Sequence, residues 1–314
     1  MIGSRLERLL GVRVREVQDL GMNHRWRLHR AVLADGRPVF VKSGKVGALF
    51  AAEAAGLRWL GEAGAVPVPQ VLAVDEETLV LPWLESEPAT APAAERFGRE
   101  LAALHAAGAE SFGASWPGFI AELPMDNTPG SSWPSWYAER RVLPFLRAAV
   151  DRGGLSKDDA RLVERVVERI EALAGPVEPP SRIHGDCWSG NVLWAGGRGW
   201  LVDPAAHGGH RETDLAMLAL FGAPFLDRIL AAYQEVSPLA DGWRARDLAM
   251  LALFGAPFLD RILAAYQEVS PLADGWRARV PLHQLHPLLV HVVLFGRGYR
   301  SAVVEAARAA LAAG

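Results

Sequence analysis

The sequence predicts an α+β fold of two lobes, a small antiparallel sheet followed by a larger, mostly helical region. With 314 residues, the chain is long for a single hydrophobic core. Residues 12–42 contain stretches that alternate at the period of β-strands, whereas several stretches after residue 93 have apolar residues at helical spacing. The proline-containing segment 85–92 separates these patterns. We therefore expect an N-lobe at residues 1–85 and a C-lobe at residues 86–314.

The N-lobe should contain four strands. They are expected at residues 12–17, 26–32, 38–42 and 78–84. Gly21 falls in the predicted turn between the first two strands, which can be an ordinary hairpin or a loop that covers a ligand. The last strand ends at Trp83, Leu84 and Glu85, where we expect a hinge between the lobes.

Lys42 ends the third predicted strand. A lysine that ends a buried strand is costly unless it meets an anion, so Lys42 is a candidate anion-binding residue; the alternative is an exposed strand end. Residues 48–60 predict a helix, because they combine strong helix formers with helical apolar spacing. Glu53 on this helix can orient Lys42 or can simply be solvated.

The C-lobe should be built mainly from helices. They are expected at residues 93–107, 143–150, 158–173 and 281–295. We expect His105, near the end of the first, to cap or pack. The segment 111–137 is rich in aromatic residues and turn formers, which suits the wall of a small-molecule pocket or a loop anchored on the helices. Asp126 and Asn127 in this segment are candidate substrate contacts.

The most informative stretch combines acidic and amide side chains at fixed spacing. It reads Ile183-His184-Gly185-Asp186-Cys187-Trp188-Ser189-Gly190-Asn191, and Leu201-Val202-Asp203-Pro204 follows. In the protein-kinase signature, one Asp receives the acceptor hydroxyl proton, and an Asn and a later Asp hold magnesium. Asp186, Asn191 and Asp203 fit these roles. The alternative, that the Gly-Asp and Gly-Asn pairs are only turns, does not explain the whole pattern.

Two short apolar runs connect the candidate metal ligands. Residues 192–194 and 200–202 flank a glycine-rich turn, which predicts a hairpin that brings Asn191 and Asp203 together. Together with the N-lobe pattern, this predicts a bilobal protein-kinase-like fold that binds ATP and Mg²⁺. In such a fold Gly21 would lie over the nucleotide phosphates, Lys42 and Glu53 would orient them, and the backbone near residues 83–85 would bind adenine.

One stretch of the chain occurs twice. Residues 214–246 recur without a change as residues 247–279. Repeat architectures usually drift between copies and need three or more units, so this pair indicates a recent, engineered or erroneous tandem duplication. Asp214 in the first copy is expected to be a helix N-cap.

Three histidines lie close together near the C-terminus. His283, His286 and His291 would approach one helical face, which permits a metal site. Pro287 is expected to interrupt the helix, and the sequence places no carboxylate or cysteine nearby. We therefore favour partly buried, hydrogen-bonded histidines over ligands.

Composition is that of an ordinary globular enzyme. Half of the residues are hydrophobic, 22% are charged, and the net charge is −3, which gives no sign of nucleic-acid binding. Cys187 is the only cysteine, so no intramolecular disulfide can form. We expect no transmembrane helix and no signal peptide, and hence a cytoplasmic protein. The sequence does not indicate an oligomeric state.

The chain resembles the fructosamine kinase (ketosamine-3-kinase) family, which belongs to a wider group with aminoglycoside phosphotransferases and choline kinases. The resemblance rests on His-Gly-Asp-Cys-Trp-Ser-Gly-Asn, Val-Asp-Pro, Arg-Glu-Thr-Asp-Leu-Ala-Met-Leu-Ala-Leu-Phe-Gly and Met-Asp-Asn-Thr-Pro, and extends from Gly21 to Tyr299. It implies ATP-dependent phosphorylation of a sugar hydroxyl on small-molecule or protein-bound ketosamines, and therefore deglycation. It also implies that Asp186 is the base and that Trp188 stacks on the sugar.

Two features depart from the family pattern. Cys187 stands where the family commonly has Leu, a tolerable change for a small hydrophobic residue. The family has one Asp-Leu-Ala-Met block and this chain has two, so one copy is surplus. Two alternative functions therefore stay open: a related kinase for an aminoglycoside or amino alcohol, and an inactive nucleotide-binding protein impaired by the duplication.

Overall fold

The structure, a computed structural model, describes residues 2–220 and 259–313, and its first part forms a five-stranded antiparallel sheet with the strand order β1-β2-β3-β5-β4. The strands are β1 (Val14–Asn23), β2 (Trp26–Leu33), β3 (Pro38–Ser43), β4 (Ala73–Asp75) and β5 (Thr78–Pro82). All four expected strands are present. The proposed lobe boundary at residue 85 falls between β5 and the first helix of the C-lobe.

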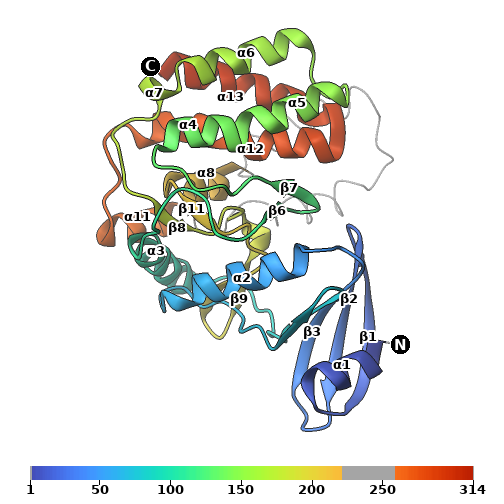
Figure 1. Ribbon diagram of the computed structural model, residues 1–314. Coiled ribbons are helices and arrows are strands. Elements are labelled where there is room, and N and C mark those ends of the chain that lie inside the picture. Colours follow the sequence, from blue (N-terminus) through green and yellow to red (C-terminus); the bar gives the residue numbers. More distant parts are fainter. Residues whose placement is uncertain (1, 221–258, 314) are drawn as a thin grey trace, which may run out of the picture.

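Both faces of this sheet are covered by helices. α1 (Ile2–Leu10) places Leu6 against Val80 of β5 on one face, and α2 (Leu49–Glu62) packs Phe50 against Leu79 and Leu81 on the other. Successive side chains of a strand point to opposite faces, which explains why the side chains of β5 are buried from Thr78 to Leu81. Figure 1 shows α2 lying between the sheet and the rest of the molecule.

The turn between β1 and β2 differs from the predicted one. Gly21 lies within β1, next to a register shift in its pairing with β2, and has a φ of +100°. The chain reverses between Asn23 and Trp26, where His24 has a φ of +51°. Periodicity could not show that the strand continues through the glycine, because the pairing with β2 shifts its register there and breaks the alternation of side chains.

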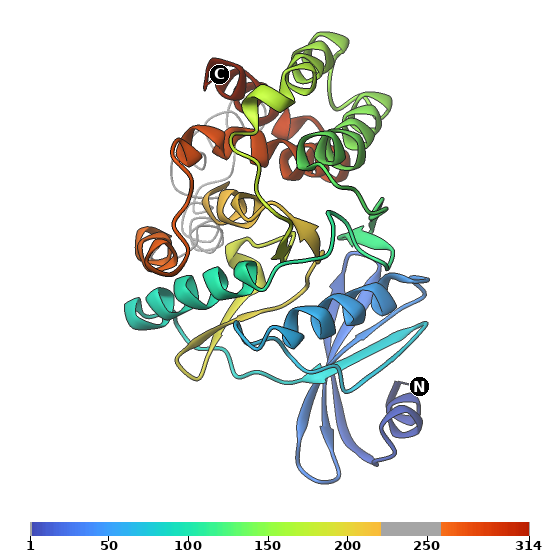
Figure 2. The ribbon, with the colours of Figure 1, turned by 60° about the vertical axis from the view of Figure 1, so that its left-hand side comes forward.

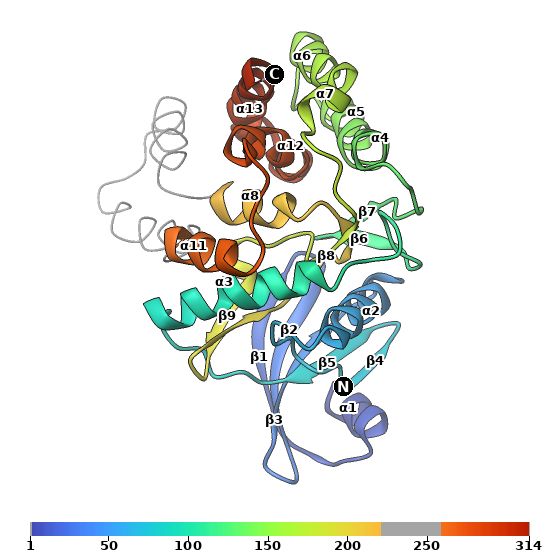
Figure 3. The same cartoon turned by 90° about the vertical axis from the view of Figure 1, so that its left-hand side faces the viewer.

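The remainder of the described chain is mainly helical. Its helices are α3 (Ala91–Ala106), α4 (Trp133–Tyr137), α5 (Leu143–Asp151), α6 (Lys157–Glu168), α7 (Ile170–Leu173), α8 (Glu212–Leu220), α11 (Leu259–Val269), α12 (Trp276–Phe295) and α13 (Arg300–Ala313). A π-helical turn, Ala138–Val142, links α4 to α5. Figures 2 and 3 show this helical part on the far side of α2 from the sheet, with α3 beside α11.

Three small hairpins or strand pairs shape the region between the lobes. β9 (Val192–Ala195) and β10 (Arg198–Leu201) pair antiparallel, which confirms the predicted hairpin. β8 (Ser181–Ile183) pairs with β11 (His207–Gly209), and β6 (Gly118–Ile120) pairs with β7 (Leu123–Met125). Because β8 and β11 flank the acidic motif, they fix both of its ends.

The described parts of the repeat come from different copies. α8 contains the start of the first copy, and α11 with the segment up to Arg279 is the end of the second. In the repeat unit these two parts do not overlap, since Leu259 corresponds to Leu226 of the first copy. Residues 221–258, which include Asp247 and the rest of both copies, lie outside the described residues.

Pro287 does not interrupt the C-terminal helix, contrary to expectation. α12 runs through it without a break. Proline lacks the N–H that would bond to the carbonyl of His283, four residues earlier. The hydroxyl of Tyr137 lies 3.0 Å from the carbonyl oxygen of Leu282 and 3.1 Å from that of His283, and it accepts the N–H of His286 at 3.2 Å. A side chain from another helix thus satisfies the freed backbone groups.

Within residues 2–220 and 259–313, the helices are all too short or too polar to cross a lipid bilayer.

Candidate active site

A cavity of about 550 Å³ lies between the sheet and the helical region, and the central candidate residues all face it. They are Lys42, Glu53, Asp186, Asn191 and Asp203. Lys42 comes from β3 and Glu53 from α2, whereas the other three come from the loops beside β9 and β10. The cavity is therefore formed by both proposed lobes.

Lys42 lies between two carboxylates. Its Nζ donates to Oε1 and Oε2 of Glu53 at 2.8 and 2.9 Å, and to Oδ1 of Asp203 at 2.7 Å. Burial alone would lower the pKa of Lys42, but the charges of Asp203 and Glu53 raise it above its usual value. The ammonium is consequently charged and is positioned at the floor of the cavity, where it can meet an anion.

Asp203 has an unusual backbone. Its φ is +54°, a left-handed conformation that Asp tolerates better than most residues. This conformation accompanies a carboxylate that remains 39% exposed while still reaching Lys42. Backbone strain of this kind is concentrated at functional sites.

Asn191 and Asp203 offer oxygen ligands on one side of the cavity. The Nδ2 of Asn191 donates to the backbone carbonyl and to Oδ2 of Asp186, both at 2.9 Å. The N–H of Val202 donates to the carbonyl of Asn191 at 3.0 Å, which joins the two segments. An amide oxygen and a carboxylate that line one cavity suit a hard divalent cation.

Asp186 has the environment of a proton acceptor. Burial raises its pKa to about 8, the hydrogen bond from Asn191 opposes that rise, and the charges of Asp203 and Asp214 add to it. A carboxylate with a raised pKa accepts a proton more readily from a hydroxyl. The side chain can therefore serve as a base toward a group held in the cavity.

Two residues to which the sequence analysis gave no role in this site fix the loop around Asp186. His184 lies 2.9 Å from the Val202 carbonyl through Nε2, and its Nδ1 accepts the N–H of Asp186 at 3.3 Å. Asp214, fully buried, accepts the N–H groups of His184 and Gly185 at 2.7 and 2.9 Å. The predicted N-cap role of Asp214 is wrong, because α8 begins at Glu212 and the carboxylate points to the loop.

His105 completes the support of Asp214. Its Nε2 donates to Oδ2 of Asp214 at 3.1 Å, and its Nδ1 lies 2.9 Å from the hydroxyl of Tyr266. Burial alone would raise the pKa of Asp214, but the hydrogen bond and charge of His105 lower it below its usual value. His105 is thus a buried packing residue, as expected.

Glycine is required at two positions of the motif. Gly185 has a φ of +81°, and a Cβ there would lie 2.3 Å from the carbonyl oxygen of Ala205. A Cβ on Gly190 would lie 2.2 Å from the ring of Trp188. The indole of Trp188 thus lies flat over Gly190 and faces the cavity. Cys187 is fully buried in the hydrophobic core, as expected of a small hydrophobic residue.

Aromatic residues from both ends of the helical region line part of the cavity. Trp116 and Phe119 come from the 111–137 segment, and Phe295 and Tyr299 come from the C-terminal helices. Flat rings of this kind pack on sugars and aliphatic stems. Part of the aromatic segment therefore forms pocket wall, and the rest, including Trp133 and Trp136, is anchored in the helical core, so both interpretations of the sequence apply.

Several candidate residues do not line the cavity. They are Gly21, Trp83, Leu84, Glu85, Asp126 and Asn127. Asn23 and His24, at the tip of the β1–β2 hairpin, face the cavity where Gly21 was expected. The N–H of Trp83 donates to the carbonyl of Pro38 at 3.2 Å. The expected nucleotide contact near residues 83–85 and the substrate contacts of Asp126 and Asn127 stay predictions.

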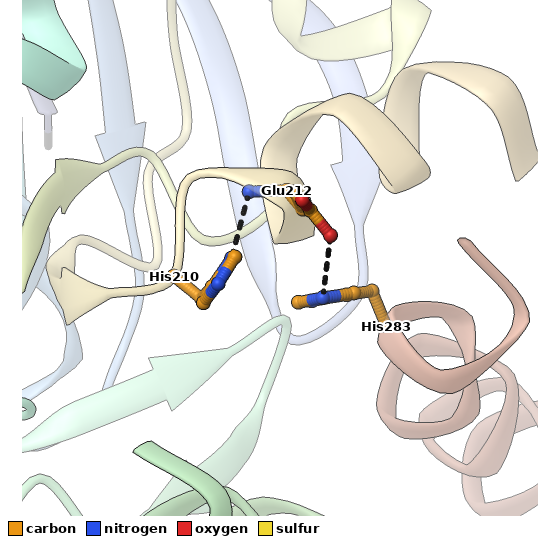
Figure 4. A group of neighbouring side chains, drawn as sticks. All are labelled: His210, Glu212 and His283. Carbon is orange, nitrogen blue, oxygen red and sulfur yellow. Dashed lines mark hydrogen bonds and ion pairs between the residues drawn. The ribbon is translucent and has the colours of Figure 1, made fainter. Parts of the chain in front are cut away.

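A second cluster combines His210, Glu212 and His283, whose ligand atoms lie within 4.8 Å of one another (Figure 4). Nε2 of His283 is 3.3 Å from Oε2 of Glu212, so the expectation that no carboxylate is near this histidine is wrong. Arg279 donates to both carboxylate oxygens of Glu212, at 2.9 and 2.5 Å. A metal ion here would meet this guanidinium, so we interpret the cluster as a buried ion-pair network.

The three C-terminal histidines do not converge. Nδ1 of His283 lies 3.0 Å from the hydroxyl of Thr213, and Nδ1 of His291 donates to the Pro287 carbonyl at 2.7 Å. His286 packs edge-on against Phe145, and its Nε2 has no hydrogen-bond partner in the described part of the chain. The preference for buried histidines over a metal site is thus consistent with the structure.

The fold and the cavity define the class of the protein. A five-stranded sheet with a buried lysine, a helix that pairs this lysine with a glutamate, and a helical lobe that supplies Asp186, Asn191 and Asp203 constitute a protein-kinase-like phosphotransferase. An aminoglycoside phosphotransferase solved with gentamicin has the same fold, with a TM-score of 0.61 at 13% identity over 99% of this chain and 95% of that one.

Within that class, the chain belongs to the fructosamine kinase family, which it matches over residues 12–247 and again over 242–313. It is 35% identical over 259 residues to a Thermus thermophilus protein named Probable ketoamine kinase, covering 82% of this chain and 81% of that one. A solved structure from Thermobifida fusca, described with the name fructosamine-3-kinase, has a TM-score of 0.86 and 52% identity, covering 99% and 98% of the two chains.

Membership of this family makes the protein an ATP-dependent phosphotransferase, an enzyme class that works with a divalent metal. The two family matches overlap at residues 242–247, where the first copy of the repeat gives way to the second. The family pattern therefore runs through one copy and resumes in the next.

Proposed function

We propose that the protein transfers the γ-phosphoryl group of ATP to a sugar hydroxyl of a ketosamine, the adduct that glycation leaves on an amine or a lysine side chain. The observation that carries this proposal is that Asp186, the Lys42–Asp203 pair and several aromatic side chains line one cavity. A nucleotide bound at Lys42 and a sugar bound at the rings would meet at Asp186.

Each residue then has a distinct task. Lys42, held by Glu53, binds phosphate oxygens, and Asp203, which contacts this lysine, would be a ligand of the metal. Asn191 and Asp203 would hold Mg²⁺, which neutralises charge on the phosphates when it is bound. Asp186 accepts the proton of the acceptor hydroxyl. Trp188 stacks on the sugar ring.

The proposal includes deglycation of proteins or small molecules as the outcome, and a reducing cytoplasmic compartment, which the single cysteine favours. Relatives that carry the ketoamine kinase name support the acceptor class. The fold shared with an aminoglycoside phosphotransferase makes aminoglycosides the first alternative to test.

The test compares ATP consumption with ribulosamine and fructosamine acceptors against a panel of aminoglycosides and choline. Turnover only with ketosamines supports the proposal, and preference for a panel compound favours the related kinase. Failure with every acceptor, with Mg·ATP binding intact, would favour an inactive nucleotide-binding protein.

Asp186→Ala is expected to abolish turnover and leave Mg·ATP binding largely unchanged. Retained turnover in this variant would argue against Asp186 as the base.

A further inference from the structure

Arg141 is a buried cation whose charge no carboxylate neutralises directly. It lies on the π-helical turn between α4 and α5 and is 1% exposed. Within the described residues, Arg141 forms no ion pair with an Asp or Glu side chain. The nearby carboxylate of Asp126 pairs with Arg140 instead. Burying a cation without such a partner is costly, so the position requires an explanation.

The guanidinium donates to two oxygens of one loop and, from Nη1, to the backbone carbonyl of Arg140 at 3.2 Å. Nη1 donates to the backbone carbonyl of Asp126 at 2.7 Å, and Nη2 donates to Oδ1 of Asn127 at 2.6 Å. The plane of the cation lies over the ring of Trp136, 4.3 Å from its centroid. Backbone carbonyl groups, the side-chain oxygen of Asn127 and the face of the Trp136 ring thus stabilise the positive charge in place of a carboxylate.

Asn127 transmits this contact to the cavity wall. Its Nδ2 donates to the backbone carbonyl of Trp116 at 3.3 Å, and its backbone carbonyl accepts the N–H of Ala114 at 2.9 Å. A Cβ added to Gly118 would lie 2.7 Å from Oδ1 of Asn127, so the amide is packed directly against that backbone. Residues 116–121 all line the cavity.

We propose that Arg141 and Asn127 are positioning residues, which hold the wall formed by residues 116–121 at the distance from Asp186 that the acceptor requires. The inference rests on the proposed function, because it assigns this wall to the acceptor and not to the nucleotide. Lys42, Glu53 and Asp203 have no contact with Arg141 or Asn127 in the hydrogen bonds and ion pairs of the described residues. Although the wall packs against α2, loosening it should therefore affect the acceptor more than the nucleotide.

The decisive variant is Asn127→Asp. Its carboxylate keeps an oxygen for Arg141 and supplies the missing counter-ion, so the fold should be retained. It lacks the N–H that binds the Trp116 carbonyl and places an oxygen against that carbonyl. We expect kcat/KM for the ketosamine to fall about tenfold or more, with the KM for ATP unchanged.

Arg141→Gln and Arg141→Lys test the other partner. The Arg141→Gln variant should show the same loss in acceptor kcat/KM as Asn127→Asp. The Arg141→Lys variant keeps the positive charge but not the planar set of donors, so its acceptor kcat/KM should be intermediate between those of Arg141→Gln and the wild type. The matched control is Arg140→Gln, which changes the adjacent, partly exposed arginine that contacts Asp126 and not Asn127. This control should keep the acceptor kcat/KM of the wild type.

Hydrogen exchange of residues 112–130 tests the same wall without an acceptor. The amides of Ala114 and Gly130 should exchange faster in Asn127→Asp than in the wild type or in Arg140→Gln. Wild-type inactivity toward ketosamines would refute the proposed function, and this exchange experiment would still decide the positioning role. Unchanged exchange, a wild-type acceptor kcat/KM in Asn127→Asp, or a parallel rise in the KM for ATP would overturn the inference.

Discussion

Asp214 shows how much of the site depends on side chains that never face the substrate. It accepts two backbone N–H groups that precede Asp186, and His105 holds it from the other side. Hydrogen bonds to a charged acceptor are about twice as strong as neutral ones, so the loop is held firmly. The orientation of Asp186 therefore depends on a carboxylate that is completely buried.

Replacing Asp214 by Asn should slow the chemical step. The carboxylate accepts the two backbone N–H groups with its two oxygens, whereas the amide of Asn has only one oxygen. The NH₂ group of the amide would face one of these backbone N–H groups, which would then have no acceptor. We expect kcat to fall about tenfold or more, which corresponds to roughly 1.4 kcal/mol in the barrier, with the KM for ATP little changed. Steady-state kinetics beside Asp158→Asn, an exposed control on α6, measures this effect; equal kcat values for the two variants would refute it.

Residue-level prediction from sequence succeeded where chemistry and spacing are local. Asp186, Asn191 and Asp203 stand in one short pattern, and Lys42 ends a recognisable strand with Glu53 on the next helix, so their convergence could be expected. The role of Asp214 could not, because its partners lie 30 and 29 residues earlier in the chain. The proximity of Glu212 to His283 was missed for the same reason, since 71 positions separate them in the sequence.

At the scale of elements, α12 is a continuous helix although its sequence contains a proline that should break it. Pro287 removes one backbone hydrogen bond, and the local rule predicted a break there. Tyr137, from α4, bonds to the freed backbone instead. The rule therefore failed because a tertiary contact that periodicity cannot show replaced the missing local bond.

Tyr137→Phe should destabilise the protein by about 1–3 kcal/mol, because it leaves buried backbone groups without partners. In a Pro287→Ala background the same change should cost less, since the introduced alanine supplies the N–H that the His283 carbonyl lacks. A double-mutant cycle in denaturant unfolding measures this coupling. An identical cost in both backgrounds would show that Tyr137 does not compensate for the proline.

For the whole molecule, the repeat raises the question of how much chain the fold requires. Helix α8 contains the start of the repeat unit and α11 contains a later part of it. No position of the repeat unit therefore occurs in both helices. Since the copies are identical and adjacent, removing residues 247–279 or residues 214–246 yields the same chain. Such a chain retains every residue type that packs in the described helical core.

We expect the single-copy chain to keep the activity of the full chain. The acidic motif, the supporting Asp214 and the buried Glu212–Arg279 pair all have their equivalents in it. Thermal unfolding and phosphate transfer should be compared for both chains at equal concentration. Loss of folding or activity on deletion would show that the additional 33 residues are part of the working structure.

The most direct measurement is a crystal structure with Mn²⁺ and a non-hydrolysable ATP analogue, in which anomalous scattering locates the metal. The account predicts a metal about 2.2 Å from oxygens of Asp203 and Asn191, with Lys42 on the phosphates and the γ-phosphate facing Asp186. A metal bound away from Asn191 and Asp203, or a triphosphate that does not reach Lys42, would contradict it.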